Sequence, residues 1–193
     1  MTLEQTVAAT YSDAPRRARY DGMTIALHWV TALLVVLLFG TAVAWGKLLP
    51  REWHLHRPLE SVHISFGILL AAVVVTRLVW RIVKGRRLPQ AGSRSVHLLS
   101  KAVHWLLYAL LAAVIGLGFA MRLIEGQDLS FFGLFSIPSM FGSDRALGHT
   151  LENLHNIVAW TIIYVAGGHA IAALFHHHVL RDGVLRRMIP ARA

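Results

Sequence analysis

Four long apolar runs, separated by polar links, follow one another along the chain. They cover Met23 to about Trp45, about Val62 to Val83, about Ala102 to Leu123, and His149 to His178. Each run is long enough to cross a ~30 Å hydrocarbon core as a helix, which takes ~20 mostly apolar residues. The pattern predicts an all-α integral membrane protein built as a four-helix bundle.

The runs also divide the chain into one domain and two tails. A chain of 193 residues is the size of a single domain, and we place the bundle at residues 23–180. Residues 1–22 are polar without apolar periodicity and are expected to form a loose N-terminal tail. Residues 181–193 are expected to form a basic C-terminal tail.

Three links join the predicted spans. Lys47 to Ser61 is polar, and Lys84 to Lys101 is basic and is expected to be a loop. The third link, Ile124 to Gly148, contains the stretch LSFFGLFSIPSMFG. Its aromatic residues favour a re-entrant or surface-lying segment at the membrane interface, with an apolar loop packed on the helix ends as the alternative.

The composition narrows the possible chemistry. The chain is 55% hydrophobic and only 15% charged, as expected for a membrane protein, and it has no cysteine. Disulfides, thiolate-ligated zinc and cysteine-held iron–sulfur clusters are therefore excluded. Twelve histidines leave imidazole as the obvious metal ligand.

The positive charges indicate the orientation in the membrane. Of the 19 Lys and Arg residues, 14 lie in the N-terminal tail, the 77–101 region and the C-terminal tail. Cytoplasmic segments carry such an excess, so we expect an inner-membrane protein with both termini in the cytoplasm. In a membrane protein this accounts for the net charge of +9 better than nucleic-acid binding does.

Two histidines within the last run lie on one face of the predicted helix. His155 and His169 are fourteen residues apart, which brings them within ~40° of alignment and sets them ~21 Å apart along the axis. A single histidine in a span is often only a hydrogen-bonded core side chain. Two on one stripe, one toward each membrane surface, indicate a helix that ligates two metal centres.

The predicted topology gives each of these histidines a partner at matched depth. His28 lies near the cytoplasmic end of the first span, as His169 does in the fourth, while His63 and His155 lie near the outer ends of the second and fourth spans. Two imidazoles from facing helices form the axial ligand set of a b-type haem in a bundle core. We therefore predict two non-covalent haems b, ligated by His28 with His169 and by His63 with His155.

Other histidines are weaker candidates. His176 lies on nearly the same stripe as His169 and could replace it by angle alone, but the run His176–His178 is at the polar boundary, where an interfacial role is expected. His54 and His56 lie in a proline-flanked link and are expected to be solvated. His97 and His104 lie at one membrane edge without matched partners.

Two features near His63 leave alternatives open. Gly67 follows four residues later on the same helix face, where a missing side chain either lets a flat ring approach or serves helix packing. The link before His63 holds Lys47, Arg51 and Arg57 against Glu52 and Glu60. This excess of positive charge either attracts a small anion or pairs with haem propionates or lipid phosphates.

Several stretches resemble the bacterial cytochrome b561 family of small four-helix, di-haem, quinone-linked cytochromes. They are IALHWV, SVHISFGI, VHWLLYALL and GHAIAALFHHHVLRDGVLRRMIP. The resemblance extends from about His28 to Pro190, and the family's haem ligands map onto His28, His63, His155 and His169. It implies electron exchange with ubiquinone and, in the characterised type, oxidation of superoxide at the periplasmic face.

The favoured function is therefore a superoxide:ubiquinone oxidoreductase. One alternative is a b-type anchor subunit that passes electrons to a membrane hydrogenase or dehydrogenase partner. A metal transporter is disfavoured because hard cations need oxygen ligands. The acids nearest the spans all lie at or beyond the predicted helix ends, namely Glu60, Glu125, Asp144 and Glu152.

Overall fold

Four long helices make up most of the structure, a computed structural model that describes residues 19–50, 52–86, 88, 93–140 and 142–190. The helices are α2 (Gly22–Val43), α3 (His56–Val83), α4 (Arg94–Ile124) and α5 (Arg145–Phe175). Each is long and apolar enough to cross a membrane. The predicted fold class, an all-α membrane bundle of four helices, is confirmed.

Shorter elements lie at the helix ends. α2 continues into the π-helix η1 (Ala44–Leu48), and α5 continues into the π-helix η2 (His176–Leu180). A 3-10 helix, η3 (Leu185–Met188), follows η2. Between α4 and α5 lie two short strands, β1 (Leu129–Phe131) and β2 (Phe135–Ile137).

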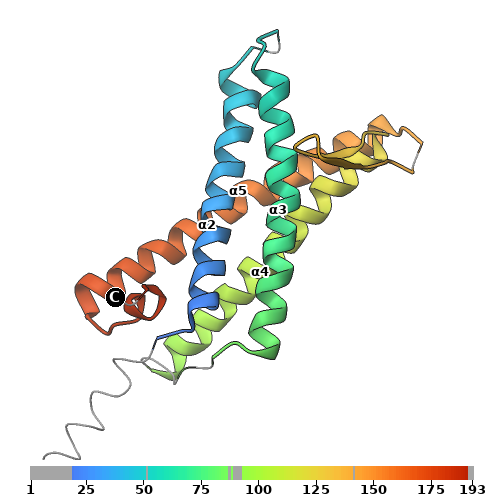
Figure 1. Ribbon diagram of the computed structural model, residues 1–193. Coiled ribbons are helices and arrows are strands. Elements are labelled where there is room, and N and C mark those ends of the chain that lie inside the picture. The colour runs from blue at the N-terminus through green and yellow to red at the C-terminus, as the bar shows by residue number, and fades with distance from the viewer. Residues whose placement is uncertain (1–18, 51, 87, 89–92, 141, 191–193) are drawn as a thin grey trace, which may run out of the picture.

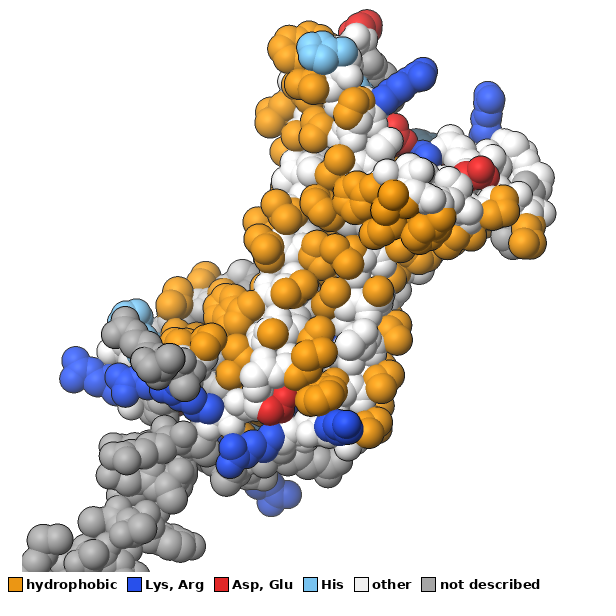
Figure 2. All heavy atoms as spheres, viewed as in Figure 1, with side chains coloured by type: hydrophobic (Ala, Val, Ile, Leu, Met, Phe, Trp, Pro, Cys, Tyr) orange, Lys and Arg blue, Asp and Glu red, His pale blue; other side chains and the backbone are white. Residues whose placement is uncertain are grey.

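The helices form two antiparallel pairs that cross each other, α2 with α3 and α4 with α5 (Figure 1). The buried core lies at the crossing and is apolar, consisting of Leu34, Leu70, Leu111, Val114 and Ile162. Most other apolar side chains along the helices point outward, and Figure 2 shows them along the middle of the bundle. This distribution suits a bundle surrounded by lipid, because apolar side chains are then favourable on the outside as well.

The helices extend beyond the apolar runs that predicted them. α3 begins at His56, inside the predicted polar link, and α4 begins at Arg94, so the prediction of a loop over Lys84–Lys101 is wrong for its second half. The start of α4 is stabilised by Ser93, whose Oγ accepts a hydrogen bond from Val96 N at 3.5 Å. A hydroxyl at this position satisfies one of the free N–H groups of the first turn, so the helix can begin outside the apolar region.

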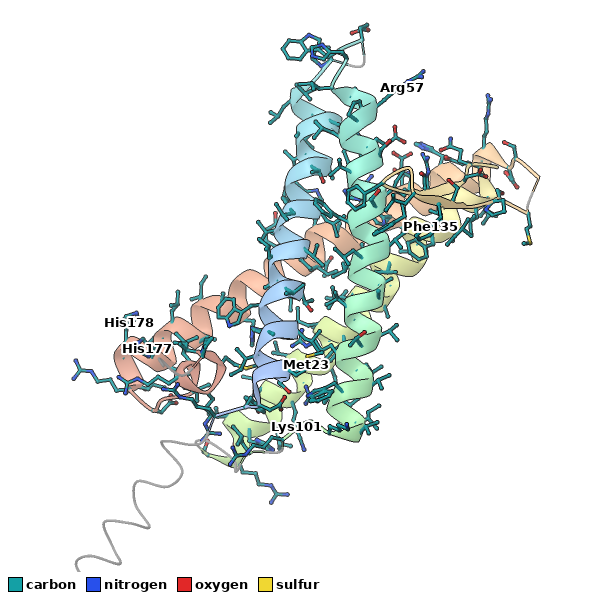
Figure 3. All side chains as sticks on the ribbon, viewed as in Figure 1. Met23, Arg57, Lys101, Phe135, His177 and His178 are labelled. Atoms are coloured by element: carbon teal, nitrogen blue, oxygen red, sulfur yellow. The ribbon has the colours of Figure 1, made fainter. Side chains whose placement is uncertain are left out.

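The aromatic link between α4 and α5 forms a hairpin on the surface of α3. β1 pairs with β2 in antiparallel register, and Ser65 of α3 donates to Ser130 O at 3.3 Å and accepts from Phe132 N at 2.8 Å. The ring of Phe132 contacts that of Phe66. Phe135 at the far strand is half exposed (Figure 3). The hairpin is therefore surface-lying and packed against a helix, and it combines features of both predicted alternatives.

Both ends of the described chain meet at one end of the bundle. Tyr20 N donates to Arg187 O at 3.1 Å, and Trp29 Nε1 donates to Met188 O at 2.8 Å. The segment around η3 therefore packs on the start of α2 and is not the simple tail that the sequence suggested. Residues 1–18, for which a loose tail was predicted, lie outside the described residues.

Asp21 connects three segments at the same end. Its carboxylate caps α2 by accepting from Thr24 N at 2.9 Å, and it also accepts from Trp80 Nε1 at 2.8 Å and Arg86 N at 3.3 Å. Burial by itself would raise the pKa of this carboxyl, but the hydrogen bonds outweigh burial and hold the pKa well below its usual range. Asp21 thus fixes the start of α2 to the end of α3.

Candidate haem sites

His63 of α3 and His155 of α5 face each other near one end of the bundle. Their ring centroids are 6.4 Å apart. The Nδ1 atom of His63 lies 3.0 Å from the backbone oxygen of Leu38, and Nδ1 of His155 lies 2.9 Å from that of Val114. Both Nδ1 atoms therefore donate to carbonyls, which leaves both Nε2 atoms without a proton and available to a metal.

The separation of these two rings suits a shared iron. A metal–imidazole bond is ~2 Å long and a ring nitrogen lies ~1 Å from its centroid, so two imidazoles on opposite sides of one ion have centroids ~6 Å apart. The observed 6.4 Å agrees with this value. The pair predicted from matched depth therefore lies together, with a ring separation and hydrogen bonds that are compatible with a shared haem iron.

Two glycines leave room around this pair. A Cβ atom at Gly118 of α4 would lie 3.1 Å from Cε1 and 3.3 Å from Nδ1 of His155, so a side chain there would press on the imidazole. A Cβ atom at Gly67 would meet nothing within 4 Å. Because a packing glycine has close neighbours, the space beside Gly67 favours approach by a flat ring over helix packing.

Side chains from α2 and η1 hold His63 in place. Thr41 Oγ1 lies 3.2 Å from His63 Nδ1, and the indole ring of Trp45 meets the imidazole edge-on at a centroid distance of 4.7 Å. Neither residue stands out in the sequence as part of a site. Trp45 ends an apolar run, and the only available signal was the preference of Trp for membrane interfaces.

A buried guanidinium lies one helical turn from Gly118. Arg122 Nη1 pairs with Glu60 Oε1 at 2.7 Å, while its Nε atom is buried and has no hydrogen-bond partner. An unsatisfied buried donor is costly, and a carboxylate would relieve that cost. Arg122 is therefore suited to hold a propionate of a haem between His63 and His155.

Three histidines gather at the other end of the bundle. The ring centroids of His104 and His169 are 5.1 Å apart, and His28 is close enough to interact electrostatically with both. The structure thus brings the predicted pair, His28 and His169, into one cluster. The expectation that His104 has no partner at its depth is wrong, because its ring contacts that of His169.

We name these two groups by the sides of the membrane that the sequence predicts for them: His63 with His155 is the outer pair, and His28, His104 and His169 form the inner cluster. The inner cluster matches a two-imidazole haem site less well than the outer pair does. Arg77 Nη2 lies 3.1 Å from His28 Nδ1 and can only donate, so in this arrangement the imidazole proton is on Nε2. His28 would have to release Arg77 before Nε2 could bind iron. His104 Nδ1 instead lies 2.6 Å from Ser100 O and donates to it, which leaves its Nε2 free.

Two arginines of α3 flank the inner cluster. Arg77 and Arg81 lie over the ring of Tyr108 at 5.2 and 5.7 Å. No ion pair within the described part of the chain involves either arginine, so both are available to the carboxylates of a bound group. A haem at this end would bring its own propionates, which suit such guanidinium groups.

The remaining histidines are engaged elsewhere or exposed. His176 Nδ1 bonds to the carboxylate of Asp182, and His54 is exposed and stacks on Trp53. The described residues contain no group of three or more His, Asp or Glu side chains arranged to hold a bare metal ion.

Comparison with known proteins identifies similar chains of nearly the same length. The sequence model of the prokaryotic cytochrome b561 family matches residues 19–191. Cytochrome b561 homolog 2 of Escherichia coli is 29% identical over 181 residues, which cover 93% of this chain and 95% of that protein. The probable superoxide oxidase CybB of Yersinia pestis is 30% identical over 177 residues, covering 90% and 97%. Cytochrome b561 homolog 1 of E. coli is 27% identical over 179 residues, covering 90% and 98%.

Proposed function

Because the chain belongs to the prokaryotic cytochrome b561 family, we propose that it is a di-haem cytochrome that carries electrons from superoxide at the periplasmic face to ubiquinone. Membrane electron transfer with b-type haem is common to the family. The observation that carries the proposal is the outer histidine pair, with ring centroids 6.4 Å apart and both Nδ1 atoms bonded to carbonyls.

Each end of the bundle would hold one haem. At the outer end the ligands are His63 and His155, and Arg122 would pair with a propionate. At the inner end the ligands are His28 and His169, with Arg77 moving from His28 Nδ1 to a propionate. This exchange of partners would free the His28 ring to turn Nε2 toward the iron.

The reaction balances as two one-electron steps. Two superoxide anions lose one electron each and leave as dioxygen, and ubiquinone takes up the two electrons with two protons to form the quinol. A bound haem b supplies a one-electron carrier at each end. His63 and His155 orient the outer carrier, and the indole of Trp45 shields the His63 ring from water.

Charge at the outer end favours an anionic substrate. Glu60, in the second turn of α3, is engaged by Arg122 at 2.7 Å and no longer offsets the basic residues at this end of the bundle. Lys47 lies over the Trp160 ring at 5.1 Å, and Arg57 is exposed. Local positive potential raises the rate at which a small anion arrives. Arg51, counted with these residues in the sequence, lies outside the described part of the chain.

We infer the orientation of the chain in the inner membrane from its positive charges. The end that holds Asp21, Arg86 and Arg187 carries most of the Lys and Arg residues, and in Figure 2 their side chains gather toward the lower end of the bundle. We assign this end to the cytoplasm, since cytoplasmic segments carry the positive excess. The outer histidine pair would then lie below the periplasmic surface, where superoxide from outside arrives.

The test is to mix superoxide with the oxidised, haem-loaded protein in the presence of ubiquinone and to follow haem absorbance and quinol formation. We expect superoxide to disappear faster than by spontaneous dismutation, with one quinol formed for every two superoxide anions consumed. Superoxide decay at the uncatalysed rate, with haems that quinol reduces readily, would contradict the proposal. The b-type anchor subunit of a larger redox complex would then be the better assignment.

A further inference from the structure

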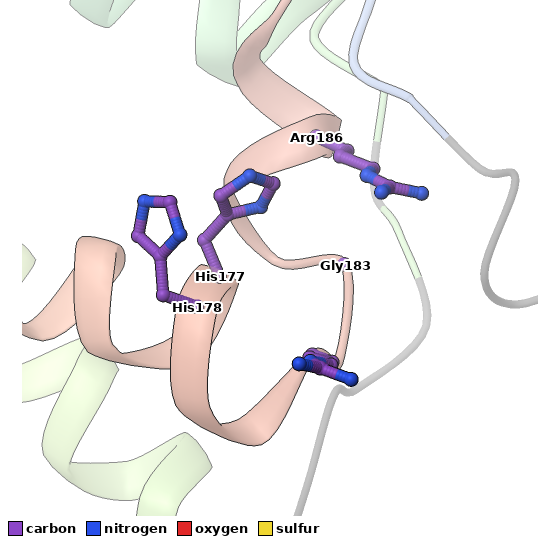
Figure 4. Close-up of a pocket in the computed structure, with 5 residues that line it drawn as sticks. His177, His178, Gly183 and Arg186 are labelled. Atoms are coloured by element: carbon purple, nitrogen blue, oxygen red, sulfur yellow. The ribbon is translucent and has the colours of Figure 1, made fainter.

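A basic pocket lies where α5 ends and the chain turns back toward α2. It has a volume of about 240 Å³ and is lined by His177, His178, Arg181, Gly183 and Arg186 (Figure 4). Two arginines and two histidines thus line one pocket. None of the haem ligands proposed above takes part in it.

The acid next to this pocket in the sequence, Asp182, is engaged by hydrogen bonds within the turn. Asp182 bonds through Oδ2 to His176 Nδ1 and accepts through Oδ1 from Val184 N at 3.0 Å. Burial would raise the pKa of this carboxyl, but its hydrogen bonds to His176 and Val184, with the positive charges of His176 and Arg187, lower it. The carboxylate is therefore committed to holding the turn. No ion pair in the described part of the chain involves Arg181 or Arg186.

The backbone of the turn is held in an unusual conformation. Arg181 has φ 52 and Gly183 has φ 76, both in the left-handed region. A residue with a long side chain is rarely found there, and such conformations persist where the surroundings fix them. Here the turn after η2 leads into the 3-10 helix η3, which carries Arg186, and η2 and η3 are in contact, so Arg181 and Arg186 line the same pocket.

Exposed apolar side chains surround the end of α5 and η2 beside the pocket. Leu174 lies one turn before His177 and His178 on the same helix face and is 50% exposed. Ile171, Phe175 and Val179, elsewhere on the same helical segment, are 69%, 52% and 62% exposed. In a membrane these side chains meet lipid chains. A positively charged pocket at the end of an exposed apolar helix matches the two parts of a phospholipid, an anionic headgroup and its acyl chains.

We propose that this pocket binds the phosphate headgroup of an anionic phospholipid, with its acyl chains along the exposed apolar side chains around Leu174. The lipid belongs to the leaflet at the end of the bundle where both termini lie. It would hold the segment after α5, and through it the start of α2, against the membrane surface. This inference does not depend on the proposed reaction or on which histidines bind haem.

The test uses native mass spectrometry of the purified, haem-loaded protein with added phosphatidylglycerol or phosphatidylcholine. We expect the wild type to retain one phosphatidylglycerol with at least tenfold preference over phosphatidylcholine. The double substitution Arg181→Gln with Arg186→Gln should abolish the preference. The matched control, Arg94→Gln with Lys101→Gln, removes the same charge from exposed residues at the same end of the bundle and should keep it.

Two outcomes would overturn the proposal. Loss of the preference in both double variants would show general attraction between charges and no specific pocket. Displacement of the lipid by millimolar inorganic phosphate would show a site for soluble phosphate. An unchanged haem spectrum and melting temperature in detergent verifies that each variant is folded. If folding fails for Arg181→Gln with Arg186→Gln, His177→Gln with His178→Gln tests the same pocket by the same measurement.

Discussion

Leu38 and Val114 contribute to the outer histidine pair through their backbone carbonyls and not through their side chains. Leu38 lies on α2 and Val114 on α4, whereas the histidines that donate to them lie on α3 and α5. All four helices therefore take part in orienting two rings. Hydrogen bonds of this kind fix the tautomer and the ring plane of a metal ligand, so the bundle itself sets the geometry of the site.

Substitution of the outer ligands tests this assignment residue by residue. We expect His63→Ala and His155→Ala each to lose one haem of two, because an iron deprived of one of two axial imidazoles is held weakly. His176→Ala should keep both haems, since that ring bonds to Asp182. Haem content per chain, measured on purified protein, is the readout. Loss of a haem in His176→Ala would contradict the assignment.

Gly118 allows a finer test of the same site. A Cβ atom there would lie 3.1 Å from the His155 ring, so Gly118→Ala should tilt the imidazole and shift the low-spin electron paramagnetic resonance signal of one haem. Gly116→Ala, two residues away on the same helix, is the control because its Cβ would meet nothing within 4 Å. Identical spectra for the two variants would show that Gly118 does not contact a haem ligand.

At the scale of single residues, the sequence predicted that His63 and His155 lie together, but it did not predict the neighbours of His28 and His169. Matched depth and helical angle were sufficient to bring His63 to His155. His104 was placed at the membrane edge because the third span was taken to begin at Ala102. α4 begins at Arg94, so His104 lies nearly three turns inside the helix and reaches His169. The contact of Arg77 with His28 depends on side-chain direction, which periodicity does not give.

The helices themselves differ from their predicted lengths for one physical reason. Hydropathy marks where the lipid ends, whereas a helix ends where its backbone hydrogen bonds are satisfied in another way. Ser93 and Asp144 cap α4 and α5 outside the apolar runs and extend both helices. The hairpin escaped prediction because its strands are only three residues long, although Gly133, with φ 72 at the turn, is typical of a tight hairpin.

The cap at Asp21 makes the attachment of α2 to α3 testable. We expect Asp21→Ala to cost about 1 kcal/mol for the lost cap, with a further loss from the bonds to Trp80 and Arg86. The pKa of Asp21 is lowered in the folded protein, so its ionised form stabilises the fold fully above the unfolded pKa of ~3.9. This contribution is lost progressively as pH falls from that value toward the lower pKa of the folded protein. The melting temperature of Asp21→Ala in detergent should therefore be lower than that of the wild type at pH 7.

The pH dependence separates a charge effect from simple loss of packing. The difference in melting temperature between wild type and Asp21→Ala should shrink as pH falls below about 4. Glu52→Ala, which removes an exposed acid from the link between α2 and α3, should match the wild type at both pH values. A difference for Asp21→Ala that stays constant across this range would contradict the role of the ionised carboxylate.

Over the whole molecule, the two crossing helix pairs separate the two histidine groups. The buried core includes Leu34, Leu70 and Ile162. On α5, His155 precedes Ile162 and His169 follows it, so the outer pair and the inner cluster lie on opposite sides of this core. The proposed transfer of electrons between the two membrane surfaces requires this separation within a single chain. Four helices and their order were predictable from hydropathy, but the crossing was not, because apolar faces on all sides do not specify neighbours.

The orientation of this arrangement is open to direct measurement. Reporter fusions after Arg86 and after Pro190 should report the cytoplasm, and fusions after Glu52 or within the turn between β1 and β2 should report the periplasm. We expect this orientation because Lys and Arg residues are in excess in the segments around Arg86 and Pro190. A periplasmic C-terminus would reverse the two histidine groups and contradict the assignment of superoxide to the His63–His155 end.

The central claim is that one chain holds two non-covalent haems b, one at each end of the bundle. The pyridine haemochrome assay on the purified protein, with protein concentration from amino-acid analysis, measures this most directly. The account predicts two haems per chain, both extracted by acid acetone because the chain has no cysteine for covalent attachment. One haem per chain, or none, would contradict it.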